Sequence, residues 1–273
     1  MYKILLLLLF VFCTSCKKDN EKNFKSTSID SKLKTNNKIQ SIKNSTENDT
    51  KLKPKTQAYS LIDYNIFFDN SFVDKTPIEI VEIGNLNLPT GKIVACDGLI
   101  SSNSSPFIKT VKPGRYPVKI YVAKTKQSGD RNAIVQIKFS HKKAIKWVMA
   151  LTENENINEF KDKYDYFGFP VDSGLGGLFD YQIWQEYQVF ESDFYRINPN
   201  KNLYDDILDK EFKKEANKNN WINFYIPNSK SNITMYSSGY GDGTYPSFWG
   251  IDEKGEIVSL VIDFLVLLTP EYK

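Results

Sequence analysis

Five aspartates stand inside apolar or glycine-rich blocks of this 273-residue sequence: Asp97, Asp172, Asp180, Asp242 and Asp263. Aspartates that meet in space bind a hard cation, or act as a pair of general acid and general base. An aspartate beside a glycine has a more ordinary role, because its side chain accepts hydrogen bonds from the backbone of a turn. Asp97 and Asp242 both precede a glycine, so we expect turn capping there. The alternative is a carboxylate- or metal-dependent hydrolase in which Asp172, Asp180 and Asp242 converge in one cleft.

Asp263 differs from the other four because it interrupts the apolar run from Leu260 to Leu268. A charge buried without a partner is costly, so an aspartate in such a run needs one. We expect a lysine, an arginine or a tyrosine hydroxyl beside Asp263, in a structural role.

Nucleophilic catalysis finds little support in the sequence. His141 is the only histidine, and Cys96 ends an apolar stretch that is typical of a buried strand. A thiol in apolar surroundings is inert, so we interpret Cys96 as a core residue and His141 as an exposed turn residue. Zinc sites built on several histidines are excluded by their number, and we expect no cofactor.

Two glycine-rich blocks are candidate binding loops. The first, residues 172–177, includes Asp172 and Gly174 and precedes an expected helix, so it resembles a loop that holds an anion. Close packing of the backbone explains the same glycines. The second block contains Tyr240, Gly241 and Asp242, and it leads to Tyr245, Phe248 and Trp249. Its aromatic residues are candidates for a surface that recognises a protein or a glycan, although aromatic residues in strands more often belong to the core.

The N-terminus predicts export and membrane attachment. Lys3 precedes an unbroken apolar run from Ile4 to Phe12, which is too short for the about 20 residues that cross a bilayer. Cys13-Thr14-Ser15-Cys16 follows, and this pattern resembles a bacterial lipobox. The resemblance implies a signal peptide over residues 1–15 and acylation of Cys16 by chains such as palmitate. Several chains anchor a protein stably where one does not. The expected location is the cell envelope, as an outer-membrane lipoprotein on its periplasmic or surface-exposed side.

The net charge of +3 does not indicate nucleic-acid binding, because of where the charges lie. Residues 17–56 contain eleven lysines and five acidic residues, whereas residues 57–273 contain 24 basic and 28 acidic residues. The lysine-, asparagine- and serine-rich stretch has too few apolar residues to form a core, so residues 16–56 are expected to be a disordered tether. Its lysines fit anionic lipid headgroups.

Residues 57–273 are expected to form a single globular domain. Alternating and apolar stretches predict strands that include 92–96, 115–124, 221–226 and 232–236. Two hairpins are expected, one joining 133–139 to 145–151 and one turning at 251–256. Helical periodicity appears after Asp180 and again from Leu203 to about Lys218. The sum is an α+β fold, mainly antiparallel and sandwich-like, with two helices inserted in the C-terminal half.

Three blocks of the sequence resemble the uncharacterised family called domain of unknown function 4241. The resemblance covers most of residues 75–264 and implies a single domain, with no activity to transfer. The three blocks are residues 91–97 with 113–118, residues 171–180, and residues 238–245. We therefore expect a tethered envelope lipoprotein with a non-catalytic binding domain, and we retain the hydrolase as the alternative.

Overall fold

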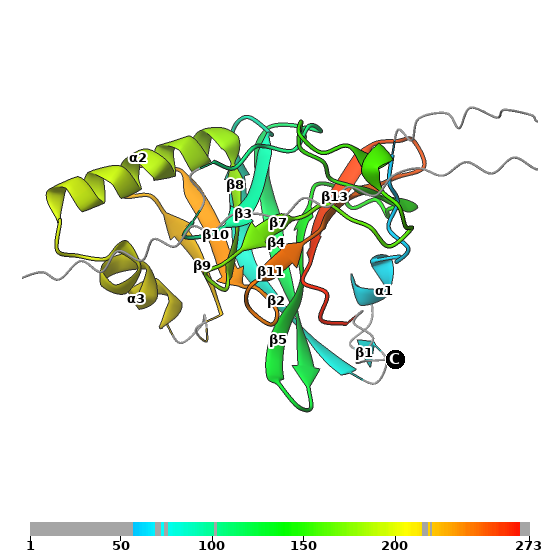
Figure 1. Cartoon of the computed structure of the whole chain (residues 1–273), viewed down its shortest axis with the longest axis horizontal. Helices are drawn as coiled ribbons and strands as arrows, with labels where there is room; N and C mark the ends of the chain where they lie inside the picture. The colour runs from blue at the N-terminus through cyan, green and yellow to red at the C-terminus, as the bar shows by residue number, and fades with distance from the viewer. Residues whose placement is uncertain are drawn as a thin grey trace, which may run out of the picture. The chain divides into compact units, whose positions relative to one another are not determined.

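The computed structural model describes residues 57–68, 72–73, 76–100, 103–214, 218 and 220–267. The signal peptide, Cys16 and the tether that were predicted from the sequence lie outside the described residues. Two larger antiparallel sheets form the domain, and the helices of residues 181–197 and 209–212 lie on one side of it (Figure 1). The antiparallel α+β class predicted from the sequence is confirmed.

The larger sheet has seven strands in the order β1-β2-β4-β5-β13-β12-β6, and all neighbours are antiparallel. β1 and β2 are consecutive in the chain, as are β4 and β5, but β3 of the other sheet separates β2 from β4 in the sequence. The C-terminal pair β12 and β13 lies between β5 and β6. The strands are β1 (Phe72–Val73), β2 (Thr76–Leu88), β4 (Gly114–Thr125), β5 (Gly129–Lys138), β6 (Lys146–Met149), β12 (Ser247–Ile251) and β13 (Ile257–Asp263).

The smaller sheet has four strands in the order β3-β8-β10-β9. A separate two-stranded ladder joins β7 to β11. The strands are β3 (Ile93–Asp97), β7 (Phe169–Val171), β8 (Leu175–Asp180), β9 (Trp221–Tyr225), β10 (Asn232–Ser237) and β11 (Gly243–Tyr245).

The four-stranded sheet is covered on both faces. Ile93 and Ala95 of β3 belong to the core that also contains the seven-stranded sheet. Val94 and Cys96 point to the other side, into a second core that contains Trp184 of α2. A strand buried on both faces has no polar residue at alternate positions, which explains the unbroken apolar run of β3. The domain is therefore layered as sheet, sheet and helices (Figure 1).

The main helix, α2 (Tyr181–Ile197), begins where the sequence predicted it. Ile183, Trp184 and Tyr187 are its buried residues, and they follow the spacing of one helical face. The second predicted helix is shorter than expected. It consists of a π-helical turn, η2 (Tyr204–Leu208), and α3 (Asp209–Phe212), and the expected extension to Lys218 runs partly through residues outside the described part. Two short helical turns, α1 (Asn65–Phe68) and η1 (Ile157–Glu159), complete the fold.

One predicted hairpin is confirmed and the other is wrong. Trp249 pairs with Leu260, so β12 and β13 form the C-terminal hairpin that the sequence predicted. The predicted hairpin of residues 133–139 and 145–151 does not exist, because β5 pairs with β4 and β13 while β6 pairs with β12. Ile145, expected on the buried face, is 67% exposed. The segment between β5 and β6 crosses over the two C-terminal strands instead of turning tightly.

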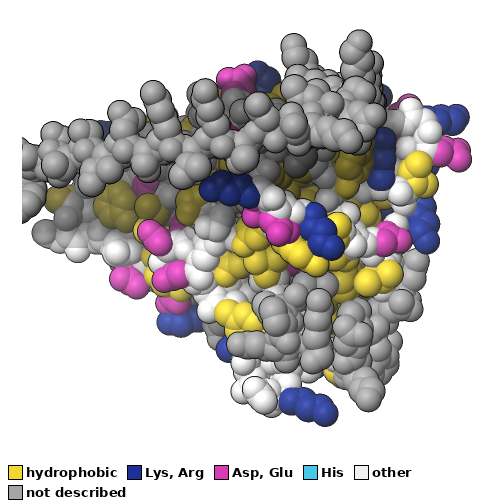
Figure 2. Space-filling view, turned by 45° about the vertical axis from the view of Figure 1, so that its right-hand side comes forward, with side chains coloured by type: hydrophobic (Ala, Val, Ile, Leu, Met, Phe, Trp, Pro, Cys, Tyr) yellow, Lys and Arg dark blue, Asp and Glu magenta, His cyan; other side chains and the backbone are white. Residues whose placement is uncertain are grey.

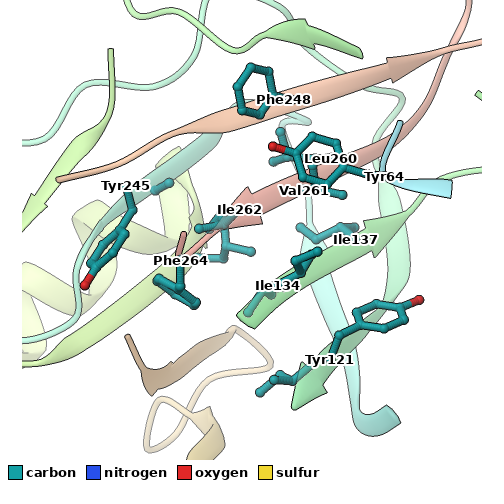
Figure 3. Close-up of a cluster of buried hydrophobic side chains, with 14 of the residues drawn as sticks. Tyr64, Tyr121, Ile134, Ile137, Tyr245, Phe248, Leu260, Val261, Ile262 and Phe264 are labelled. Atoms are coloured by element: carbon teal, nitrogen blue, oxygen red, sulfur yellow. The ribbon is translucent and has the colours of Figure 1, made fainter. Parts of the chain in front are cut away.

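Aromatic side chains fill much of the main core. Figure 3 shows Tyr64 beside Phe248, and Tyr245 against Phe264. The ring centroids of these two pairs are 5.5 Å and 4.9 Å apart. Both distances lie in the range in which aromatic pairs attract each other. Tyr64 comes from the segment before α1, so this N-terminal segment is packed onto the sheet formed by the C-terminus.

Candidate functional site

Asp97 holds two loops together. It ends β3, and its carboxylate accepts hydrogen bonds from the backbone N–H groups of Leu99 (2.8 Å) and Ile100 (2.9 Å). The same carboxylate accepts from the backbone N–H groups of Asp172 and Ser173, both at 2.8 Å, and from the Ser173 hydroxyl at 2.6 Å. Burial raises the pKa of Asp97, but the hydrogen bonds outweigh burial and hold the pKa below its usual value. The turn capping predicted for Asp97 is confirmed.

Asp180 holds a second junction, at the other end of β8. Its side chain is fully buried, and it caps α2 by accepting a hydrogen bond from the Gln182 N–H at 3.0 Å. The N–H groups of Thr90 (2.9 Å) and Gly91 (3.1 Å) and the Thr90 hydroxyl also donate to it. With its oxygens so engaged, Asp180 ties the turn before β3 to the start of the helix.

The structure does not bring Asp172, Asp180 and Asp242 into one cleft. Asp172 and Asp242 are exposed, and they follow and precede the paired residues Val171 and Gly243 of the two-stranded ladder. Asp180 lies at the opposite end of β8, about 20 Å along a six-residue strand. The carboxyl group of Asp242 makes no hydrogen bond to the described residues, unlike the turn cap expected there. Within the described part of the chain, no group of three or more His, Cys, Asp or Glu residues is arranged to hold a metal ion.

The block predicted as an anion loop is mostly a strand. Gly174 has a φ of +70° and open space beside it, but residues 175–180 form β8, paired with β3 and β10 on its two sides. Its N–H groups are therefore directed to neighbouring strands rather than to an anion at the start of a helix. The glycines serve close packing: a Cβ on Gly177 would lie 2.6 Å from the Phe179 ring and 3.3 Å from the Gly98 Cα.

Three of the four aromatic residues predicted as a recognition surface, Tyr245, Phe248 and Trp249, lie inside the domain. Tyr245 is 5% exposed and Trp249 is fully buried. The Tyr245 hydroxyl donates to the backbone carbonyl of Gly241 at 2.7 Å, which fixes the glycine loop in which Gly241 has a φ of +109°. This loop is held from within. Of its aromatic side chains, Tyr240 is 45% exposed at the surface, with the Arg131 guanidinium 5.9 Å from the centre of its ring, whereas Tyr245, Phe248 and Trp249 are not available there.

A different group of aromatic residues does reach the surface. Tyr59, Tyr164 and Tyr166 surround a cavity of about 230 Å³, together with the buried rings of Tyr64 and Phe248. We call this cavity the tyrosine pocket. Its remaining lining residues are Ser60, Leu61, Ile62, Met149, Lys163, Asp165, Pro246, Asp263 and Leu265.

Asp263 provides a carboxyl group in the lining of the tyrosine pocket. Its Oδ2 accepts a hydrogen bond from the Tyr64 hydroxyl at 2.8 Å, and its Oδ1 accepts from the Leu265 N–H at 2.8 Å. Burial raises the pKa of Asp263 to about 6, although both hydrogen bonds act to lower it. The tyrosine partner that the sequence predicted for Asp263 is thus confirmed. An ionised carboxylate has about four acceptor positions, so this group retains capacity to bind a donor.

The tyrosine pocket can bind a side chain or another small group by apolar contact and hydrogen bonding. Tyrosine rings provide rigid contact area, and their hydroxyl groups donate or accept hydrogen bonds. Lys163 lies 4.8 Å from the centre of the Tyr164 ring, so a positive charge stands at the rim. Burial, followed by the charge of Asp263, raises the pKa of Tyr166, which therefore stays protonated as a donor at neutral pH.

Sequence reasoning singled out two residues of this pocket, Asp263 and Phe248, but did not connect them. The tyrosines come from two segments about a hundred residues apart, around Tyr59 and around Tyr164, and neither has a recognisable spacing. Both segments reach β6: the Tyr59 segment is hydrogen-bonded to it, and the Phe167 N–H, just after Tyr166, donates to the Met149 sulfur. The single usable indication was a charged residue within an apolar run.

Residues 86–262 match the family described as "Protein of unknown function (DUF4241)". The chain belongs to this family. The match includes Tyr164 and Tyr166 but neither Tyr64 nor Asp263, so the tyrosine pocket combines matched and unmatched residues. Neither the curated proteins nor the solved structures contain a significant match to this chain. In the described part of the chain, no helix is both long and apolar enough to cross a bilayer.

Proposed function

We propose that this member of the DUF4241 family is a bacterial envelope lipoprotein whose folded domain binds a protein partner through the tyrosine pocket. In this proposal Cys16 is acylated, residues 17–56 form the tether, and the domain performs no catalysis. The N-terminal sequence supports the anchor, because a short apolar run and small residues precede Cys16.

The observation that carries the binding proposal is the exposure of the rim of the tyrosine pocket. Tyr59 is 53% exposed, Leu61 61% and Tyr164 66%, and they surround a hollow with a buried polar group in its lining. Tyrosine is enriched at protein interfaces, and binding energy concentrates where an aromatic residue fills a pocket. A hollow of this size accommodates one inserted side chain, and Asp263 favours one that donates a hydrogen bond, such as a lysine, arginine, tryptophan or tyrosine.

The binding proposal can be tested by photo-crosslinking in the producing cell. A photoreactive phenylalanine replaces Tyr164 at the pocket rim, or Tyr195, which is 40% exposed on α2, as the control. The proposal expects a discrete crosslinked protein from position 164 and none of the same mass from position 195. Adding Tyr59→Ala to the Tyr164 probe should weaken the crosslink, whereas adding Tyr225→Ala, at a tyrosine 49% exposed on β9, should not. Equal crosslinks from both probe positions would argue against the pocket.

The anchor has its own test. Cells are fed a clickable fatty acid, and labelling of the chain is followed on a gel. We expect labelled protein from the natural sequence and no label from Cys16→Ser. A crosslink that persists in Cys16→Ser would separate binding from anchoring, and a label that persists in Cys16→Ser would contradict the assigned acylation site.

A further inference from the structure

A second cavity, of about 280 Å³, is lined by basic residues. Four lysines and the only histidine of the chain border it: Lys119, Lys138, His141, Lys142 and Lys143. We call this cavity the basic pocket. Its other lining residues are Asn65, Phe68, Tyr121, Gln136, Ser140, Ala144, Trp147, Val258 and Ser259, so the described lining contains no carboxylate.

Strand register explains how the lysines gather. Lys119 of β4 is directly opposite Gln136 of β5, and Lys138 of β5 is directly opposite Ser259 of β13. Residues that face each other across an antiparallel pair point to the same side of the sheet. Lys119, Gln136, Lys138 and Ser259 therefore share one face. The segment from β5 toward β6 adds Lys142 and Lys143 at the edge of this face.

The charges of the basic pocket are only partly compensated. Lys119 pairs with Glu82 at 2.7 Å, and Lys142 pairs with Asp252 at 2.9 Å and with Glu256. Within the described part of the chain, Lys138 and Lys143 have no carboxylate within ion-pair distance, although the charge of Lys143 acts on the more distant Asp63 and lowers its pKa. On the face shown in Figure 2, positive and negative side chains are interspersed around exposed hydrophobic ones. Two ammonium groups without a close ion pair on one cavity favour an anionic occupant.

The buried floor of the basic pocket offers a further donor. The Tyr121 hydroxyl donates to the Gln136 Oε1 at 2.8 Å, and the Gln136 Nε2 donates to the Ser259 Oγ at 3.0 Å. Ser259 in turn donates to the Ile137 carbonyl at 3.0 Å. An amide nitrogen has two hydrogens, and the second hydrogen on the Gln136 Nε2 has no acceptor among the described residues. Gln136 is only 4% exposed, so this donor is fixed by the chain of hydrogen bonds on which it depends.

We infer that the basic pocket binds the phosphate group of a small phosphorylated ligand. A phosphate presents several acceptor oxygens and up to two negative charges, which matches the ammonium groups of Lys138 and Lys143 and the amide N–H of Gln136. The cavity exceeds the size of one phosphate group, so it also holds part of the molecule attached to it. The same group occurs in soluble phosphate compounds and in anionic lipid headgroups. This inference does not depend on the tyrosine pocket.

The test is calorimetric titration of the full-length chain in detergent with inorganic pyrophosphate. Two double variants are compared. The first carries Lys138→Gln and Lys143→Gln, and the control carries Lys109→Gln and Lys230→Gln. Lys109 and Lys230 are exposed and lie outside the basic pocket, so both variants lose the same charge from surface-accessible positions. We expect affinity to fall about tenfold or more in the first variant and less than about twofold in the second.

A second arm identifies the source of the phosphate. The lipid probe is dihexanoyl phosphatidylglycerol below its critical micelle concentration, with dihexanoyl phosphatidylcholine as its zwitterionic counterpart. Tighter binding of phosphatidylglycerol than of pyrophosphate, with this binding lost in the Lys138→Gln, Lys143→Gln variant, assigns the pocket to a lipid headgroup. Tighter binding of pyrophosphate assigns it to a soluble ligand. Failure to bind any of these probes, or equal losses in both double variants, would overturn the inference.

Discussion

The Tyr64 hydroxyl donates a 2.8 Å hydrogen bond to the Asp263 carboxylate across 199 residues of sequence. This bond joins the segment before α1 to the end of β13, and both groups are buried. Burial, followed by the negative charge of Asp263, raises the pKa of Tyr64 well above its usual value, so the tyrosine remains a hydrogen donor throughout the physiological range.

Tyr64→Phe removes this donor and leaves a buried carboxylate with one partner fewer. We expect the free energy of unfolding at pH 7 to fall by about 1–3 kcal/mol, measured by urea denaturation. The loss should be smaller near pH 4.5, where the protonated carboxyl group needs no donor from Tyr64.

Tyr236→Phe is the matched control for Tyr64→Phe. Tyr236 is equally buried, but its hydroxyl has no hydrogen-bond partner in the described part of the chain. Removing this hydroxyl should leave stability unchanged or raise it slightly. A larger loss in Tyr236→Phe than in Tyr64→Phe would contradict the importance of the bond to Asp263.

Asp263→Asn should reduce the dependence of stability on pH. The folded pKa of about 6 lies above the ordinary aspartate value of 3.8, so the folded state binds a proton that the unfolded state has already lost. This difference favours the folded state at low pH, and stability declines as the pH rises from about 4 to about 6. The decline amounts to about 3 kcal/mol, and an asparagine, which does not titrate, should abolish it. Urea midpoints across this range, compared between the two proteins, provide the measurement, and an unchanged decline in Asp263→Asn would rule out Asp263 as its source.

Asp97 and Asp172 should differ sharply when replaced by alanine. Asp97→Ala leaves the N–H groups around two loops without their acceptor, so we expect a loss of about 3 kcal/mol or more. Asp172→Ala removes an exposed carboxylate and should cost less than about 0.5 kcal/mol. Thermal unfolding followed by circular dichroism compares the two. Similar losses in both variants would mean that the role of the Asp172 side chain has been underestimated.

Gly91 and Gly174 have nearly the same positive φ but different surroundings. A Cβ on Gly91 would lie 1.9 Å from the Val111 carbonyl oxygen, whereas a Cβ on Gly174 would meet nothing within 4 Å. Gly174→Ala should therefore cost only the strain of a left-handed backbone, about 1 kcal/mol. Gly91→Ala should cost at least about 3 kcal/mol because the backbone must also move. The yield of folded protein and the urea midpoint distinguish these outcomes, and equal costs would argue against the close contact at Val111.

Local sequence patterns predicted most strands and the main helix, because apolar residues buried on one face of a strand or helix recur at a regular spacing in the sequence. Whether the pairing of two strands could be predicted depended on how far apart they lie in the sequence. The turn between β12 and β13 is short and was found, whereas β5 and β6 looked like a hairpin only because Ser140 to Lys143 is polar. No local feature indicates that two strands from beyond residue 246 enter between them.

The candidate site was less predictable than the fold for the same reason. Asp97 and Asp180 appeared in conspicuous glycine-rich blocks, and these blocks proved to be structural junctions. Tyr59 and Tyr164 lie in unremarkable segments and become neighbours of one cavity only through the sheet order. Lys119 and Lys138 likewise meet through strand register, which a single sequence does not reveal.

The position of β12 and β13 has a consequence for synthesis in the cell. A nascent chain that ends before residue 247 contains β5 and β6 but not the strands that join them, so the main sheet cannot close until residues 247–263 have been made. Both strands present unpaired backbone groups during that interval, and such edges invite pairing with other chains. Export before completion of folding, or protection by a chaperone, would keep these edges apart until the last hairpin arrives.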